Sequence, residues 1–202
     1  MATCKLPFLL IAVALSAISP GSAVASELMC NGPFGKGSSH TKLMEAFGST
    51  NVSAEMLHGP EGIEFRGSVI FPNDPARRVE VIWWNESART RPSTIRVNGT
   101  GWTGPGGIRV GAPLSAVEKA NGRVFSLNGF GWDYGGASTN WRGGTLANLA
   151  DGCTLSVTFG LDDNVPEAAR TKATGDREFA SNAPVIQAVK PKVQEIRLGY
   201  PR

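Results

Sequence analysis

The 202-residue chain falls into register with itself when it is shifted by 74 residues. At this offset, and without a gap, glycines before, after and beyond a predicted helix fall on glycines, and apolar positions of the helix fall on apolar positions. The matched pairs are Gly37 with Gly111, Gly48 with Gly122, Gly62 with Gly136, Leu43 with Val117, and Ala46 with Ala120. The apolar positions of segments 78–84 and 152–158 also keep the same phase. This agreement of caps, turns and strand phase predicts two copies of one structural unit.

Each predicted copy begins with a short helix. In the first copy the helix spans residues 40–47, where Ser38 or Ser39 serves as the N-cap and Gly48 supplies the left-handed C-terminal position. In the second copy it spans residues 114–121 and ends at Gly122. The two helices therefore define the start of each unit.

Antiparallel strands follow each predicted helix. The segments are 51–58, 62–71, 78–84 and 93–97 in the first copy, then 123–132, 137–141 and 153–159 in the second. The alternation of Val79, Val81 and Trp83 with polar neighbours is typical of a half-buried strand. We therefore expect an α+β fold of two tandem units, each a short helix followed by an antiparallel meander.

The remaining segments divide the chain further. Glycine and proline make residues 99–110 a linker between a first unit at 26–98 and a second at 111–202. Residues 160–192 are expected to form a long excursion with one helical turn at 166–172. Residues 191–201 alternate between two prolines, which predicts a final edge strand.

The N-terminus has the pattern of a secretory signal peptide. Lys5 precedes an apolar run, and small residues at Ala23 and Ala25 end it, so cleavage is expected after residue 25. No later run is apolar enough to cross a bilayer, which excludes an integral membrane segment. The mature chain of 177 residues (202 − 25) is then periplasmic or secreted.

Export determines how the cysteines are interpreted. Cys4 is removed with the signal peptide, which leaves Cys30 and Cys153. Two cysteines in an oxidising compartment most often pair, and we predict this disulfide. A free buried thiol or a nucleophile are the alternatives.

The charge of the mature chain argues against two partner classes. Removal of Lys5 lowers the net charge from +3 to +2, with 19 basic and 17 acidic residues and no basic block. Nucleic-acid binding and polybasic membrane attachment are therefore not expected.

Few residues suggest catalysis or metal binding. The chain has two histidines, His40 and His58, and no GxSxG, HxxxH or CxxC pattern. Residues 99–111 are rich in glycine but do not lead directly into a helix, and residues 161–164 lack the donor spacing of a calcium loop. We therefore expect no catalytic residue, metal or cofactor, and surface or capping roles for the histidines.

Aromatic residues are the strongest candidates for binding. Trp83 and Trp84 are adjacent, so on a strand they point to opposite faces, and Trp83 is expected in the core. The candidate contact residues cluster near glycine-rich turns in the second half of the chain. Exposed aromatic side chains beside a carboxylate stack sugars or anchor proteins, and the alternative is that these side chains fill the seam between the two units. The candidate residues are Trp102, Trp132, Asp133, Tyr134 and Trp141.

The segment 129–136, GFGWDYGG, contains three of these candidates. Its last four residues fall over residues 59–62 in the repeat, which predicts a hairpin turn with Gly135 and Gly136 at positive φ. Gly129 and Gly131 would weaken a strand, so they predict a bulge or a close backbone approach.

The repeated unit of a glycine, a short helix ending in glycine, and antiparallel strands resembles the β-lactamase-inhibitory-protein architecture over residues 35–160. Residues 107–122 are also similar to the start of the single-unit outer-membrane assembly lipoproteins of that superfamily, and residues 37–48 with 129–136 resemble uncharacterised secreted bacterial proteins. The resemblance implies a fold that presents loops and a concave sheet face to an enzyme partner. It transfers no contact residue to this chain.

Three functions follow from these observations. The first is an exported, non-enzymatic module that recognises an envelope or secreted protein through the sheet face and turns of the second unit. The second is binding of cell-wall glycan or peptidoglycan fragments through Trp102, Trp132, Tyr134 and Trp141. The third is a hydrolase whose site is not visible as a motif.

Overall fold

The computed structural model of the chain describes residues 1, 26–59 and 62–202. The predicted signal peptide and the centre of the predicted turn at 59–62 lie outside these residues. The helices are α1 (His40–Phe47), α2 (Leu114–Asn121), α3 (Glu167–Ala173) and α4 (Pro184–Val189). The strands are β1 (Ser26–Glu27), β2 (Val52–His58), β3 (Glu64–Ile70), β4 (Val79–Asn85), β5 (Thr90–Val97), β6 (Trp102–Thr103), β7 (Ser126–Asn128), β8 (Ser138–Asn140), β9 (Thr154–Gly160), β10 (Glu178–Ala180) and β11 (Lys192–Gly199). The predicted α+β class is confirmed.

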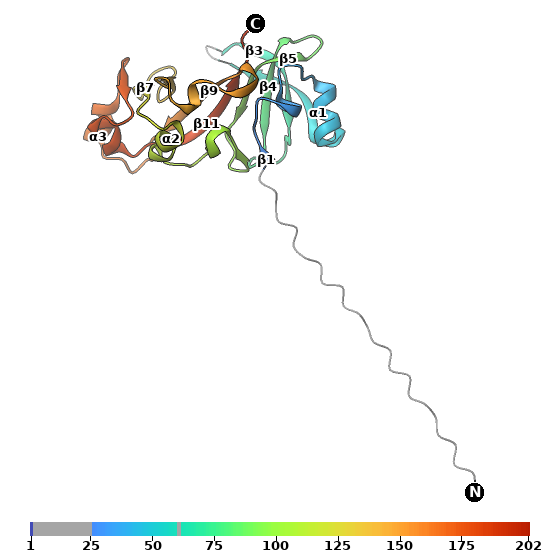
Figure 1. Cartoon of the computed structure of the whole chain (residues 1–202), viewed down its shortest axis with the longest axis horizontal. Coiled ribbons are helices and arrows are strands. Elements are labelled where there is room, and N and C mark those ends of the chain that lie inside the picture. The colour runs from blue at the N-terminus through green and yellow to red at the C-terminus, as the bar shows by residue number, and fades with distance from the viewer. Residues whose placement is uncertain (2–25, 60–61) are drawn as a thin grey trace.

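The main element is an antiparallel sheet of six strands in the order β2-β3-β4-β5-β11-β9. A three-stranded sheet, β10-β7-β8, lies beside β9, the edge strand of the large sheet. Strands β1 and β6 pair in parallel and form a separate two-stranded sheet. Figure 1 shows α1 and α3 at opposite ends of the molecule, with β11 between them. Within the described residues, none of the helices has the length and apolar character needed to cross a membrane.

The prediction of a final edge strand is wrong, because β11 lies inside the large sheet. It pairs with β5 on one side and with β9 on the other. Pro191 and Pro201 fall outside the strand, so β11 keeps its N–H groups for both neighbours. Its apolar residues Val193, Ile196 and Leu198 are buried in the core.

The predicted helices form as expected, for local reasons. The side chain of Ser39 accepts a hydrogen bond from the Lys42 amide at 3.2 Å and caps α1. Leu43 is buried, and Gly48 ends the helix at φ 88° and ψ 137°, so it has a positive φ but not the predicted left-handed helical conformation. In α2, Gly122 adopts the left-handed conformation at φ 74°.

The large sheet has one buried and one open face. Val79, Val81 and Trp83 of β4 point into the core, and the Trp83 indole donates to the Ser68 hydroxyl at 3.0 Å. Trp84, the next residue, is 37% exposed on the opposite face. The prediction that the two tryptophans face opposite sides of the sheet is therefore confirmed.

The structural elements follow the 74-residue offset through most of both copies. Helix α1 at 40–47 maps onto 114–121, the bounds of α2, and the first residues of β2 and β3, 52 and 64, map onto 126 and 138, where β7 and β8 begin. The start of β4 at 79 maps onto 153, one residue before β9. The correspondence ends at β5, whose image at 164–171 falls on α3. The duplication itself stays a prediction.

The segment 160–192 has more regular structure than predicted. The predicted single turn at 166–172 is helix α3, and α4 follows it. Between them, β10 pairs with β7 through Glu178–Asn128, Phe179–Leu127 and Ala180–Ser126. The segment is therefore part of the packed second half, because it supplies a strand that the small sheet requires.

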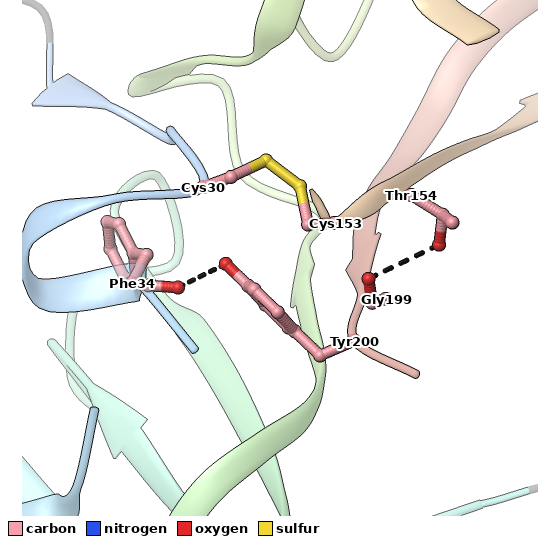
Figure 2. The surroundings of a disulfide bond; sticks show 6 residues. All are labelled: Cys30, Phe34, Cys153, Thr154, Gly199 and Tyr200. Carbon is pink, nitrogen blue, oxygen red and sulfur yellow. Dashed lines mark hydrogen bonds between the residues drawn. A yellow bond between two sulfur atoms is a disulfide. The ribbon is translucent and has the colours of Figure 1, made fainter. Parts of the chain in front are cut away.

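The predicted disulfide between Cys30 and Cys153 is present, with its Cα atoms 6.0 Å apart. Figure 2 shows the bond beside Tyr200, whose hydroxyl donates to the carbonyl oxygen of Phe34. Burial, with a contribution from the negative charge of Asp151, raises the pKa of Tyr200 to about 12. Together these contacts fasten the N-terminal segment to the ends of β9 and β11.

Candidate binding groove

A groove of about 890 Å³ crosses the open face of the large sheet. One rim is the tip of the β2–β3 hairpin, represented by His58, Gly59 and Phe65, which we call the first tip. The other rim is the loop Trp132–Gly135, between β7 and β8, which we call the second tip. Strands β4, β5, β11 and β9 form the floor, so the groove is built from both halves of the chain.

The floor combines apolar side chains with internally paired charges. Ile82 and Trp84 of β4 contribute the apolar part. In the next row, Arg96 and Arg197 are register partners on β5 and β11. The Arg96 guanidinium is paired with Glu80, and that of Arg197 lies 2.5 Å from the carboxylate of Glu195. Both arginines of the floor are therefore neutralised by neighbouring carboxylates.

Arg96 also holds the first tip over the groove. Its Nη2 donates to the carbonyl oxygen of His58 at 2.8 Å, although β3 and β4 separate β5 from β2 in the sheet. This reach is possible because β3 pairs with β4 only from Ser68 to Ile70, while it follows β2 along its whole length. The outer part of the hairpin is thus free to curl toward the floor.

The second tip is anchored by backbone contacts to other elements. The Phe159 amide of β9 donates to the carbonyl oxygen of Gly136 at 2.9 Å, and the Gly129 amide donates to that of Arg177 at 2.8 Å. A Cβ atom at Gly129 would collide with the carbonyl of Gly175, so the predicted close backbone approach is confirmed. The loop is therefore held at both of its ends.

The turn within the second tip differs in one detail from the prediction. Within the predicted turn at 133–136, Gly136 has φ 72°, as expected, but the other residue at positive φ is Tyr134, at 58°, and not Gly135. The Gly135 amide donates to the carbonyl oxygen of Trp132 at 2.8 Å, which closes the turn one residue earlier. The side-chain amide of Asn128 donates to the Tyr134 carbonyl at 3.3 Å and supports this conformation.

The five predicted contact residues divide into two groups. Trp132 and Tyr134 are each 61% exposed, and Asp133 between them is also exposed, so all three line the groove. Trp102 and Trp141 are buried, at 1% and 8% exposure, and the expectation that they offer an exposed contact is wrong.

The two buried tryptophans fill space beneath the glycine-rich segments. The Trp102 indole donates to the Arg77 carbonyl at 2.8 Å, and its ring packs edge-on against Phe34. The Trp141 indole donates to the Leu155 carbonyl at 2.9 Å, and its ring centroid lies 5.0 Å from that of Phe125. Each satisfies its polar atom internally, as a core tryptophan requires.

Trp84 belongs to the groove although the sequence did not single it out for binding. Its indole N–H donates to the Tyr200 carbonyl at 2.9 Å, and the Arg202 guanidinium lies 4.5 Å from the ring centroid. The strand phase placed Trp84 opposite the core residue Trp83. The contact with the C-terminus could not be read from that phase, because it depends on the position of β11.

The two histidines occupy different environments. His40 Nδ1 lies 2.8 Å from the Ser68 hydroxyl, which also accepts a hydrogen bond from the Trp83 indole. Burial, and then the positive charge of Arg89, lowers the pKa of His40 below 6.5. His58 is exposed and lies 3.6 Å from Glu64. In residues 26–59 and 62–202, no group of three or more metal-ligating side chains comes together.

Comparison with known proteins gives little further information. No protein-family model matches the sequence, and no curated protein is similar to it. Among solved structures, the uncharacterized protein yfeY from Escherichia coli is similar, with 15% identity and a TM-score of 0.48 over 87% of this chain and 99% of that chain. A likeness at this level supports no statement about function. None of these findings bears on the β-lactamase-inhibitory-protein resemblance, which stays an expectation.

Proposed function

We propose that the chain is an exported, non-enzymatic binding module that holds a partner protein of the cell envelope or the extracellular space in the groove. The partner lies on the floor formed by β4, β5, β11 and β9 and contacts both tips. Export is supported by the disulfide between Cys30 and Cys153, which is typical of oxidising compartments, and by the predicted signal peptide.

The observation that carries the proposal is the exposure of Trp132 and Tyr134 on an anchored loop. Large aromatic side chains are normally buried, and both are 61% exposed at the rim of the groove. Backbone hydrogen bonds from Phe159 and to Arg177 hold the loop in place. A partner therefore gains aromatic contacts without ordering the loop, which lowers the entropic cost of binding.

Burial of two tryptophans makes a protein partner preferable to a glycan. Glycan binding was expected to use four aromatic residues, and two of these, Trp102 and Trp141, are in the core. On the groove floor, the indole N–H of Trp84 is already bound by the Tyr200 carbonyl, so it is not free to donate to a sugar hydroxyl. The remaining aromatic pair at one rim suits an anchor for a protein surface better than a continuous platform for a sugar chain.

The experiment is capture of partners by the tagged mature chain from the envelope and secreted fractions of its own host, after chemical cross-linking. We expect a discrete complex that is lost with Trp132→Ala or Tyr134→Ala. Met56→Ala serves as the control, because Met56 is 50% exposed on β2 and does not line the groove. Circular dichroism shows whether each variant is folded.

Two results would contradict the proposal. The first is a complex that survives both aromatic substitutions in folded protein. The second is the absence of any protein complex, together with a change of tryptophan fluorescence when soluble muropeptides are added. The second result would instead support the glycan alternative.

A further inference from the structure

The groove has one charge that the chain itself does not balance. Besides His58, its charged lining residues are Arg96, Arg197, Asp133 and Glu195. Arg96 is paired with Glu80 outside this set, and Arg197 with Glu195. Asp133 forms no ion pair with any residue in 26–59 or 62–202. The uncompensated charge at the rim is therefore negative.

This carboxylate stands between two exposed aromatic residues. Trp132 and Tyr134 flank Asp133 in the second tip, and all three side chains are exposed to the groove. Aromatic faces attract guanidinium and ammonium groups through the ring quadrupole, and a nearby carboxylate adds a charge-assisted hydrogen bond. The tip thus has both features of a site for a cationic side chain.

The chain's own C-terminus already shows this chemistry on the floor. The guanidinium of Arg202 lies 4.5 Å from the centroid of the Trp84 ring, while the indole N–H is bound by the Tyr200 carbonyl. One face of the Trp84 ring therefore holds an arginine, although Arg202 itself is not among the residues that line the groove. A cation–π contact near solvent is weak, so a cation supplied by a partner is able to replace Arg202.

From these observations, and resting on the proposed function, we infer that the groove recognises a partner segment that carries arginine or lysine. One cationic side chain binds against Asp133, between Trp132 and Tyr134. A second cationic side chain of the partner competes with Arg202 for contact with the Trp84 ring, so Arg202 is an intramolecular competitor of the partner.

The test is an NMR titration of the mature protein, followed through its five tryptophan indole signals. The probe is a blocked peptide of alternating glycine and arginine, and its citrulline counterpart is the neutral control of the same shape. We expect saturable shifts of the Trp132 and Trp84 signals, assigned with Trp132→Phe and Trp84→Phe, with the arginine peptide only. Asp133→Asn should weaken binding about three- to tenfold.

A matched variant distinguishes the effect of the Asp133 carboxylate on affinity from the effect of net charge. Asp163→Asn makes the same change in net charge at an exposed position outside the groove, and it should leave the affinity unchanged. Arg202→Gln should increase the affinity about twofold, because the competitor for Trp84 is removed. A decrease with Arg202→Gln would overturn the competitor role.

Three outcomes would overturn the cation site. They are equal shifts with the citrulline peptide, equal weakening by Asp133→Asn and Asp163→Asn, and no shift of either signal up to about 5 mM peptide, a concentration that detects millimolar affinity. If partner capture is lost with Trp132→Ala but kept with Asp133→Asn, the proposed function stands and the cation site fails. If capture survives both Trp132→Ala and Tyr134→Ala in folded protein, the proposed function itself fails.

Discussion

The two tips that border the groove occupy corresponding places in the repeat but contribute different chemistry. The first tip ends a hairpin whose strands pair at seven positions, and its main contact with the floor is the backbone carbonyl of His58. The second tip joins β7 and β8, which pair at only two positions, and it presents Trp132, Asp133 and Tyr134. The second tip is therefore held by contacts with distant elements rather than by its own strands.

This difference indicates where a binding loop can arise in a repeated unit. A long ladder places its tip mainly through its own strand pairing, here with one added hydrogen bond from Arg96. A loop with weak local pairing needs anchors such as the Phe159 amide and the Arg177 carbonyl. Once those anchors exist, the side chains at the tip are not needed for folding and can serve recognition. The predictions below test how far the two tips differ in this respect.

The largest effect is expected from loss of the disulfide, which fastens the start of β9, the strand that anchors the second tip, to the N-terminal segment. The double variant Cys30→Ala/Cys153→Ala should lower the free energy of unfolding by about 2–5 kcal/mol in urea denaturation. Amide exchange should rise more at the second tip than at the first. Equal exchange at both would show that β9 does not need this tether, and two free thiols in unfolded, unreduced wild-type protein would exclude the disulfide.

The next effect compares one matched pair of glycines. Gly62 and Gly136 are 74 residues apart and have φ values of 75° and 72°, so alanine suffers similar backbone strain at each. No atom of the described residues lies within 4 Å of a Cβ atom placed at Gly62, whereas a Cβ atom at Gly136 would collide with the Phe159 carbonyl. We expect Gly136→Ala to cost about 3 kcal/mol and Gly62→Ala about 1 kcal/mol in thermal or urea unfolding. Equal losses of unfolding free energy for the two variants would show that the contact between Gly136 and Phe159 does not anchor the second tip.

Arg96→Met tests the support of the first tip. The change removes the hydrogen bond to the His58 carbonyl, while Glu80 keeps its contact with Arg78 at 3.1 Å. We expect a loss of about 1–2 kcal/mol and faster exchange of the Gly59 amide, which donates to the Ile63 carbonyl. The signals of Trp132 and Tyr134 should not move. A shift of those signals would mean that the two tips are coupled through the floor.

The smallest effect is a pH dependence confined to the first unit. The pKa of His40 is lowered in the folded protein, mainly by burial, so its contribution to stability is present above pH 6.5. It is lost as pH falls from 6.5 toward the folded pKa, because the unfolded chain binds the proton first. His40→Gln should reduce the difference in unfolding free energy between about pH 7.5 and about pH 5.5. The position 74 residues later is Leu114, which does not titrate, so an unchanged difference would assign the dependence to other groups.

Features set by local sequence were predictable, and those set by distant pairing were not. Caps and glycines placed α1 and α2, and alternation placed β2 to β4, because each depends on a few neighbouring residues. The central position of β11 and the pairing of β10 with β7 depend on contacts across the chain. The residue pattern within β10 or β11 does not indicate which strands they pair with.

The candidate site shows the same limit. All five aromatic and acidic candidates are near glycine-rich turns, yet only Trp132, Asp133 and Tyr134 are exposed. Trp102 and Trp141 pack in the core, where carbonyl oxygens of Arg77 and Leu155, on other segments of the chain, accept their indole N–H groups. Composition therefore found the region of the site but could not separate its surface residues from core residues.

The place of β11 has a consequence for the order in which the molecule is completed. The last strand of the chain is an inner strand of the sheet, so β5 and β9 each keep an open hydrogen-bonding edge until residues 192–199 arrive. A chain still being synthesised or threaded through a membrane is then unable to close its sheet. Completion of the sheet waits for residues 192–199, and a chain truncated before β11 would expose two edges that favour aggregation.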